Sequence, residues 1–220
     1  MKLFVFDIDD TISSTALIHQ EFFINALNQL GVKKLNTDFG SYKHHTDSYI
    51  AKQIYELDRK VPFTQDLLLA YEMKVLDQFK PIEIREVAGA VKFIKELEQE
   101  NIAIAYATGA VRKTAEFKLE QLGIPFHEKQ LVASNYIEDR KGIVTKAIIQ
   151  AKELNGVENF EDIYSFGDGI WDFKTAKALN LKFVGIGKRN KQQLIKAGTA
   201  LYFDDYQEDG MLQKILHKKR

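Results

Sequence analysis

Six short apolar segments recur along the chain, and most of the stretches between them have the spacing of amphipathic helices. Short runs of β-branched and aromatic residues are typical of strands that are buried on both faces. Strands that alternate with helices predict a parallel sheet covered by helices on both sides, which is the doubly wound, Rossmann-like α/β class. The predicted strands are 3–8, 102–107, 131–133, 163–166, 183–186 and 200–203.

The segment 13–85 interrupts this alternation, because it contains no convincing strand. Its first part has apolar residues every four positions, which predicts a long helix with one apolar face. Residues 47–58 and 66–79 also have amphipathic helical spacing. We therefore expect a Rossmann-like core formed by 1–12 and 86–220, with a helical domain, 13–85, inserted after the first strand.

Composition narrows the range of functions. Lys and Arg total 31 and Asp and Glu total 31, so the net charge of zero gives no electrostatic reason to expect nucleic acid as a partner. The absence of cysteine excludes a disulfide framework, a thiolate nucleophile and a cysteine-ligated metal. No window approaches the ~20 apolar residues of a membrane span. We expect a cytoplasmic protein with no membrane partner, and its oligomeric state stays open.

Two carboxylates, Asp7 and Asp9, lie at the end of the first predicted strand. In open α/β sheets, ligands bind outside the carboxyl ends of the strands, where the strand order reverses. Carboxylates two residues apart on an extended chain point the same way and repel one another unless a cation compensates them. Mg²⁺ suits this arrangement, because it binds one or two carboxylates together with substrate phosphate. A solvated acidic turn is the alternative.

Two other strand ends carry groups that suit phosphate. Thr108 and Gly109 end the next core strand, where a hydroxyl and the free N–H groups of a helix start can hold a phosphate oxygen, although Thr is also a common helix cap. Lys141 precedes the helix predicted from residue 143, and a lysine there can reach the same crevice. Lys146, one turn later, is a rival for that role, and both lysines could lie on the surface.

A second pair of carboxylates, Asp168 and Asp172, follows the strand at 163–166. Glycines on both sides of Asp168 permit a tight turn, and Asp172 shares its face if a helix has begun there. The alternative is an Asp-Gly turn with a helix cap. Two acids beside an acidic first strand argue for a cation, and the four strand ends together predict one phosphate and magnesium site.

In the order of these groups at four strand ends, the sequence resembles the haloacid dehalogenase superfamily of phosphohydrolases. The run Asp-Ile-Asp-Asp-Thr at 7–11 resembles the first family motif, Thr108 the second, Lys141 the third, and the run at 167–172 the fourth. The resemblance covers the whole chain, and the insertion at 13–85 stands where the family has its first type of helical cap. Asp10 replaces a glycine found in many members, and Gly142 replaces a proline of one branch.

The resemblance implies a Mg²⁺-dependent phosphatase that works through an aspartyl-phosphate. Asp7 would be the nucleophile and Asp9 the general acid and base. Asp7, the Asp9 backbone carbonyl, Asp168 and Asp172 would hold the metal, whereas Thr108, Gly109 and Lys141 would hold the phosphoryl oxygens. A phosphomutase of the same superfamily, similar to phosphoglucomutase, is the alternative, because mutases keep the same acids.

The inserted helices are expected to select the substrate, a small phosphorylated metabolite. A sugar phosphate, a phosphoglycolate-like acid and a nucleotide all remain open. The polar stretch 42–49 supplies candidates for contacts to the leaving group, with Thr46 and Asp47 equally suited to cap the following helix. The candidates are Lys43, His44, His45 and Thr46, with Asp47 beside them.

Two other classes of protein share parts of this pattern. Receiver domains also combine acids, a Thr and a Lys on a doubly wound sheet, but they lack a helical insertion after the first strand. A catalytically idle binding protein on the same fold is the other alternative. The filled catalytic positions argue against it.

Overall fold

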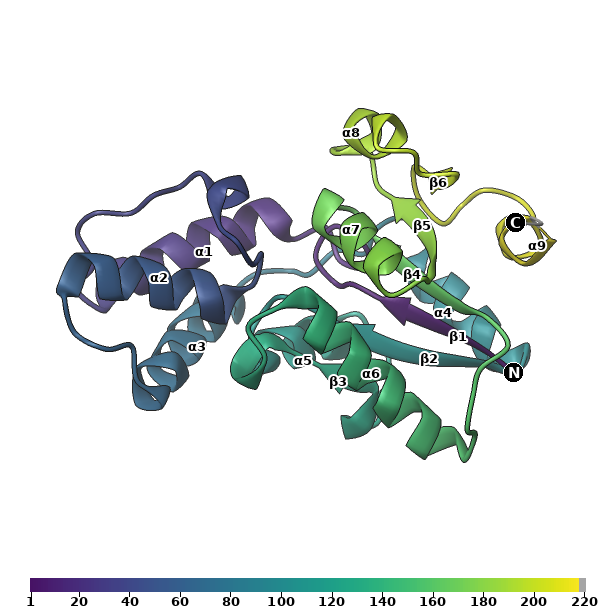
Figure 1. Cartoon of the computed structure of the whole chain (residues 1–220), viewed down its shortest axis with the longest axis horizontal. Coiled ribbons are helices and arrows are strands. Elements are labelled where there is room, and N and C mark those ends of the chain that lie inside the picture. The colour runs from purple at the N-terminus through teal and green to yellow at the C-terminus, as the bar shows by residue number, and fades with distance from the viewer. Residues whose placement is uncertain (218–220) are drawn as a thin grey trace.

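The first strand of the chain lies at the centre of a six-stranded parallel sheet whose order is β3-β2-β1-β4-β5-β6. The computed structural model describes residues 1–217. The strand order reverses between β1 and β4, so the doubly wound class expected from the alternation of strands and helices is confirmed (Figure 1). The strands are β1 (Lys2–Phe6), β2 (Ile102–Ala107), β3 (Leu131–Val132), β4 (Ile163–Gly167), β5 (Lys182–Ile186) and β6 (Leu201–Phe203).

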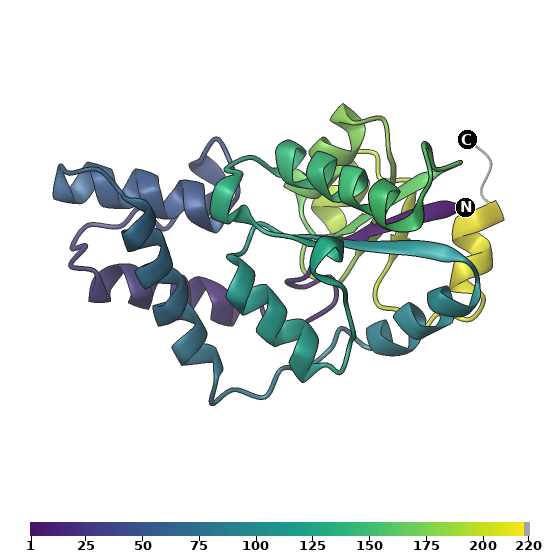
Figure 2. The same ribbon diagram turned by 90° about the horizontal axis from the view of Figure 1, so that it is seen from below.

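Helices cover both faces of this sheet, as the edge-on view of Figure 2 shows. Apolar residues of α4, α5 and α9 pack with one face in a large hydrophobic cluster, and those of α6 form a cluster on the other face. α7 packs beside α6 against β4 and β5. The bounds are α4 (Ala90–Gln99), α5 (Arg112–Gln121), α6 (Arg140–Asn155), α7 (Ile170–Ala178), α8 (Lys191–Lys196) and α9 (Met211–His217).

Side chains along β1 point alternately toward the two faces of the sheet. Phe4 and Phe6 point into the cluster beneath α4 and α5, whereas Leu3 and Val5 point toward α6. Asp7 continues the odd-numbered series beyond the strand, so its side chain emerges on the α6 side. The alternation of side chains along this one buried strand therefore places Asp7 beside the start of α6.

Three inserted helices form a separate layer beside the carboxyl edge of the sheet (Figure 1). They are α1 (Ala16–Gln29), α2 (Asp47–Arg59) and α3 (Gln65–Phe79), and they share a hydrophobic cluster that Val111 of the core joins. The two connections to the core run side by side, because Ser14 N donates to Arg85 O (2.8 Å) and Val87 N donates to Ile12 O (2.7 Å).

Short 3-10 turns complete the connections, and they are η1 (Phe39–Ser41), η2 (Glu128–Gln130) and η3 (Ser134–Tyr136). Across residues 1–217, the structure contains no helix with the length and apolarity that crossing a bilayer requires.

Phe166 of β4 lies at the centre of an aromatic cluster in the core. Its ring centroid is 4.4 Å from that of Phe6 and 4.9 Å from that of Phe4. We expect Phe166→Ala to lower the free energy of unfolding by about 3–5 kcal/mol, because the truncation leaves a cavity in a fully buried cluster. Urea denaturation measures this change. Leu57→Ala, at a position 71% exposed, is the control and should change stability by less than about 0.5 kcal/mol. A loss as small for Phe166→Ala would contradict this view of the core.

Candidate functional site

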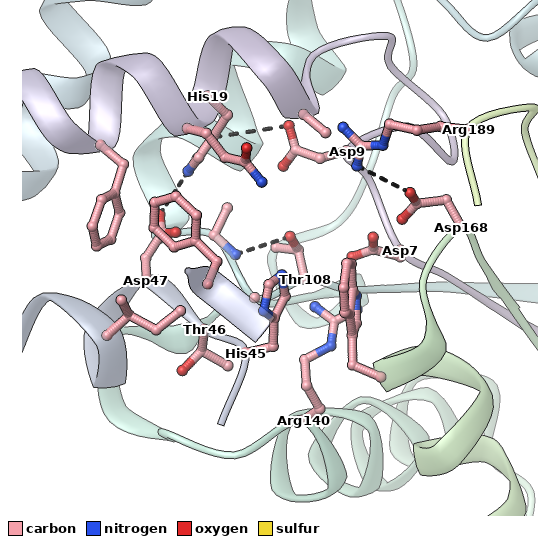
Figure 3. Close-up of a pocket in the computed structure, with 18 residues that line it drawn as sticks. Asp7, Asp9, His19, His45, Thr46, Asp47, Thr108, Arg140, Asp168 and Arg189 are labelled. Atoms are coloured by element: carbon pink, nitrogen blue, oxygen red, sulfur yellow. Dashed lines mark hydrogen bonds and ion pairs between the residues drawn. The ribbon is translucent and has the colours of Figure 1, made fainter. Parts of the chain in front are cut away.

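Three buried carboxylates meet where the strand order reverses. Asp7 follows β1, Asp168 follows β4, and Asp172 lies in the first turn of α7. One oxygen atom from each lies within 4.8 Å of the others. The structure thus brings together carboxylates from both acidic motifs, at the edge of the sheet where ligands bind in doubly wound folds (Figure 3).

Arg140 is the cation that balances this cluster. Its Nη2 lies 3.0 Å from Asp7 Oδ1 and also contacts Asp172 Oδ1, and its side chain is only 8% exposed. Burial alone would lower the pKa of Arg140, but the charges of Asp172 and Asp7 outweigh burial and raise it. The guanidinium therefore stays charged between the two acids.

Lys141, the residue expected to hold phosphate, does not reach this site. Its side chain is exposed, as is that of Lys146. The reason is the start of α6, which begins at residue 140 and not at 143, because the Asp139 carboxylate caps it by accepting a bond from Gly142 N (2.8 Å). In the first turn Arg140 faces the sheet edge, and the next residue is rotated by about 100° toward solvent.

Burial sets the protonation of the acids. Desolvation raises the pKa of Asp7 to about 7, against the opposing charge of Arg140. Desolvation, together with the charges of Asp172 and Asp7, raises the pKa of Asp168 well above its usual value. An additional cation among these oxygens would favour the ionised forms of both.

The donor set fits Mg²⁺ by its chemistry. Magnesium takes hard oxygen ligands, and the cluster offers three carboxylates whose charge exceeds that of the single buried arginine. The residues that would hold the ion are Asp7, Asp168 and Asp172. The backbone carbonyl of Asp9 is a further candidate, as the family resemblance implies.

Thr108 and Gly109 line the same cavity, directly beyond β2. The Thr108 hydroxyl accepts a bond from Ala110 N (3.1 Å) and does not cap α5, which begins only at Arg112. Gly109 O accepts a bond from Asp47 N (2.8 Å), so the start of α2 contacts the core here. A Cβ at Gly109 would lie 2.8 Å from the carbonyl oxygen of His45, which explains why this position has no side chain.

Asp9 is held by a buried lysine that the sequence analysis missed. Lys118 of α5 has no exposed side-chain surface, and its Nζ lies 2.5 Å from Asp9 Oδ1. The Thr15 hydroxyl donates to the same oxygen (2.5 Å). Burial alone would raise the pKa of Asp9, but the charges of Lys118 and His19 outweigh it and lower the pKa to about 2.

The chain of polar contacts continues from Lys118 into the inserted helices. Its Nζ lies 2.8 Å from His19 Nδ1, and His19 Nε2 lies 2.8 Å from Asp47 Oδ2. Lys118 also lies over the ring of Phe79, 4.5 Å from the centroid. One ion network therefore links the core to the inserted helices, and Figure 3 shows its contacts among Asp9, His19 and Asp47.

Sequence spacing contained a signal for Lys118. Ala115, Leu119 and Leu122 define the apolar face of this helix, and position 118 falls on that same face. A lysine on an otherwise apolar face requires a buried partner. The identity of that partner was not accessible, because Asp9 and His19 are distant in sequence.

Asp10 has a backbone φ of 54°, in the left-handed region. This explains why glycine suits the position, and aspartate is among the few other residues that tolerate it. Asp10 Oδ1 accepts a bond from Ala16 N (3.0 Å), and its Oδ2 lies 3.3 Å from Arg189 Nη1. Arg189 Nη2 in turn lies 3.4 Å from Asp168 Oδ2, so the departure from the resembled motif anchors a second arginine beside the site.

The candidates of the polar stretch 42–49 divide into two groups. His45 and Thr46 line the cavity, together with Asp47. Lys43 is exposed, and His44 packs its ring against Tyr49 (4.7 Å between centroids), and neither lines the cavity. Thr46 stands at the cap position of α2 but donates its hydroxyl to Glu138 O (2.6 Å) of the core, so it ties the two domains together.

Most of the chain matches one known protein family. Residues 4–186 match the family described as haloacid dehalogenase-like hydrolase. The chain belongs to this family, which confirms the resemblance seen in its motifs.

Solved structures share the fold over nearly the whole chain. CbbY from Rhodobacter sphaeroides in complex with phosphate has a TM-score of 0.73 at 18% identity, covering 94% of this chain and 96% of its own. A β-phosphoglucomutase from Clostridium difficile has a TM-score of 0.70 at 17% identity, with 97% and 96% covered. A hydrolase from Pseudomonas syringae has a TM-score of 0.64 at 20% identity, with 93% and 94% covered.

We expect Lys118→Met to destabilise the protein at pH 7 by about 3–5 kcal/mol, because the charge of Asp9, whose side chain is only 17% exposed, loses its buried partner. In the wild type, the lowered pKa of Asp9 gives stability that is present above about pH 4 and lost toward pH 2. In the variant, protonation of Asp9 relieves the penalty, so the difference should shrink as the pH falls from 7 to 4. Urea denaturation at both pH values measures it.

The double variant Asp9→Asn/Lys118→Met is the control for this experiment, because it removes both charges. It should recover most of the stability that Lys118→Met loses. If the stability losses of the two single substitutions simply add in the double variant, the broken ion pair is not the cause of the destabilisation.

Proposed function

We propose that the protein is a Mg²⁺-dependent phosphatase that hydrolyses a small phosphorylated metabolite through an aspartyl-phosphate on Asp7. The observation that carries this proposal is the convergence of Asp7, Asp168 and Asp172 at the carboxyl edge of the sheet. Asp9, Thr108 and Arg140 line the same cavity. Bound Mg²⁺ would supply charge neutralisation, so that an anionic nucleophile can approach an anionic phosphate.

Asp7 is the proposed nucleophile. Its carboxylate oxygen forms a bond to phosphorus while the bond from phosphorus to the ester oxygen breaks. The backbone fixes it firmly, because Asp7 N donates to Phe166 O (3.0 Å) at the junction of β1 and β4. Arg140 holds one carboxylate oxygen and limits the side chain to few orientations.

Asp9 is the proposed general acid and base. In the first step it would give a proton to the leaving alcohol, and in the second it would take a proton from the water that attacks phosphorus. The charges of Lys118 and His19, with hydrogen bonds from Lys118 and Thr15, outweigh burial and lower the pKa of Asp9 to about 2, which favours the ionised form that accepts a proton. For the first step, a proton must enter and the contact with Lys118 must weaken.

The oxygens of the transferring phosphoryl group need fixed donors. Thr108, the N–H groups that follow it and Arg140 are the proposed donors, with Arg140 in the role first assigned to Lys141. A guanidinium presents planar, paired N–H groups that match phosphate geometry, whereas an ammonium acts as a point charge.

We further propose that 13–85 acts as a cap over this cavity, with its hinge where residues 12–14 and 85–87 run side by side. The contacts of Thr46 and Asp47 with the core support this proposal. A closed cap would keep bulk water from the site while the phosphorylated aspartate forms.

We propose phosphatase rather than mutase chemistry on the basis of the charges that line the cavity. A mutase that transfers phosphate within a sugar must hold a second phosphate away from the nucleophile, which requires cations there. The part of the cavity formed by the inserted domain is lined by aromatic rings, histidines and the Asp47 carboxylate, with no lysine or arginine among its described residues.

We expect Asp7→Asn to abolish phosphate release from phenyl phosphate with Mg²⁺, by at least about a thousandfold in kcat, because the amide is a poor nucleophile. A phosphate-release assay with Mg²⁺ measures this. Asp66→Asn makes the same chemical change at an exposed residue of α3 and should leave the rate unchanged. Equal activity of Asp7→Asn and wild type would refute the assignment of the nucleophile.

The raised pKa values also predict how Mg²⁺ affects stability. Asp7 has a pKa of about 7 when folded, against a usual value of 3.8, so folding takes up a proton between these values. The metal-free protein should therefore lose stability as the pH rises through about 4 to 7. Because Mg²⁺ needs ionised carboxylates, it should raise Tm more at pH 8 than at pH 5.

Thermal unfolding with and without MgCl₂ measures this difference, with KCl at matched ionic strength as the control. Activity should decline over the same range as the pH falls below 7. An equal Mg²⁺ effect on Tm at both pH values would speak against these carboxylates as the ligands.

A further inference from the structure

The cavity has two halves of different chemistry. The half formed by the core carries carboxylates, the Thr108 hydroxyl and Arg140, as a phosphate site requires. The half where the leaving group would lie is lined mainly by apolar side chains. Its apolar and aromatic lining residues are Ala16, Phe23, Phe39, Ile50 and Trp171.

The apolar half is built from tightly packed side chains. Phe23 is 2% exposed and meets Phe39 edge to face, with centroids 5.5 Å apart and planes at 87°. It meets Tyr71 in the same way at 5.4 Å. On the opposite side, the rings of His45 and Trp171 stack at 3.7 Å with their planes at 21°. Side chains fixed in this way define one shape and adapt poorly to a polar ligand.

The cations that line the cavity are already committed. Arg140 pairs with Asp7 and Asp172, and Arg189 pairs with Asp10 and Asp168. Burial, followed by the charge of Arg140, lowers the pKa of His45, so its ring is neutral near pH 7. Throughout residues 1–217, no cation without a carboxylate partner faces the leaving-group half.

Most polar groups of this half are occupied too. Thr46 donates to Glu138 O, and the Asp47 carboxylate contacts His19 and accepts from Val111 N (3.3 Å). Gln20 lines the cavity, and its amide makes no hydrogen bond within the described chain. Its carbonyl oxygen and NH₂ group can bond a small number of hydroxyl or carbonyl groups of the ligand.

From these walls we infer that the substrate is a monophosphate of a compact, uncharged and largely apolar alcohol. This inference rests on the proposed phosphatase function. The cavity volume is about 90 Å³. With the inserted helices in this position, this small cavity favours a small leaving group over a nucleoside.

Each of the other substrate classes leaves a buried group without a partner. A carboxylate or a second phosphate would lie among aromatic rings and near the Asp47 carboxylate, with no free cation to pair with it. A polyol would bury several hydroxyls against a wall that offers few polar groups besides the Gln20 amide and the Asp47 carboxylate, and an unmade hydrogen bond costs more than its formation contributes.

A matched series of four-carbon alcohols tests the inference. Butyl phosphate is apolar, erythritol 4-phosphate is a polyol, 4-phosphooxybutanoate carries a carboxylate, and butane-1,4-diol bisphosphate carries a second phosphate. With Mg²⁺ present, we expect kcat/KM for butyl phosphate to exceed that of each of the other three by at least about tenfold. Phosphate release is measured for all four and for phenyl phosphate.

A variant with an added cation provides the second measurement. Phe39→Lys places an ammonium at the half-buried edge of the apolar wall, and it should raise the ratio of kcat/KM for 4-phosphooxybutanoate to that for butyl phosphate by about tenfold. Phe63→Lys makes the same change at a half-buried residue of the inserted domain that does not line the cavity, and it should leave the ratio unchanged.

The outcomes separate this inference from the proposed function. Preference for the polyol, the carboxylate or the bisphosphate would overturn the inference and leave the phosphatase function standing. An unchanged ratio for Phe39→Lys, with the folded state verified by circular dichroism, would show that this wall does not contact the leaving group. If none of the five esters releases phosphate, the phosphatase function itself fails, and the inference with it.

Discussion

The crowding of three carboxylates into one buried space is the constraint on which the rest of the site depends. Asp7, Asp168 and Asp172 cannot all be ionised there without cations, and Arg140 supplies one. The requirement extends to the backbone, because a Cβ at Gly167 would lie 2.4 Å from the Asp172 Cβ. The last residue of β4 therefore has no side chain, and the acid can fold back over the strand. The crowded carboxylate of Asp172 thus dictates how β4 ends.

A second ion network is centred on a buried lysine. Lys118 contacts Asp9 and His19, and His19 contacts Asp47 at the start of α2. These residues come from a core loop, a core helix and the inserted helices, so moving the inserted domain as a rigid body would separate charges that have little access to water. The position of that domain and the orientation of Asp9 are therefore coupled through the same contacts.

The fold was largely predictable from the sequence, because buried parallel strands and amphipathic helices have different periodicities. The acids were predictable as well, since strand ends meet at one edge whatever the helices do. The cations were harder to place. Arg140 and Lys141 are neighbours, and the choice between them depended on whether α6 began at residue 140 or 143, which the Asp139 cap decides. Lys118, Asp9 and His19 come together only through tertiary packing, which no local pattern encodes.

The arginine at position 140 would also affect how the proposed site binds phosphate. Nη2 of the guanidinium contacts both Asp7 and Asp172, and the planar group keeps further N–H groups directed along its plane. In the proposed function, a cation among the carboxylates would weaken the pull of those acids on Arg140, and the guanidinium would become available to a phosphate oxygen. Binding of metal and binding of phosphate would then favour one another through this single side chain. The apolar wall opposite adds no charge of its own, so the phosphate would be the part of the ligand that these charges recognise.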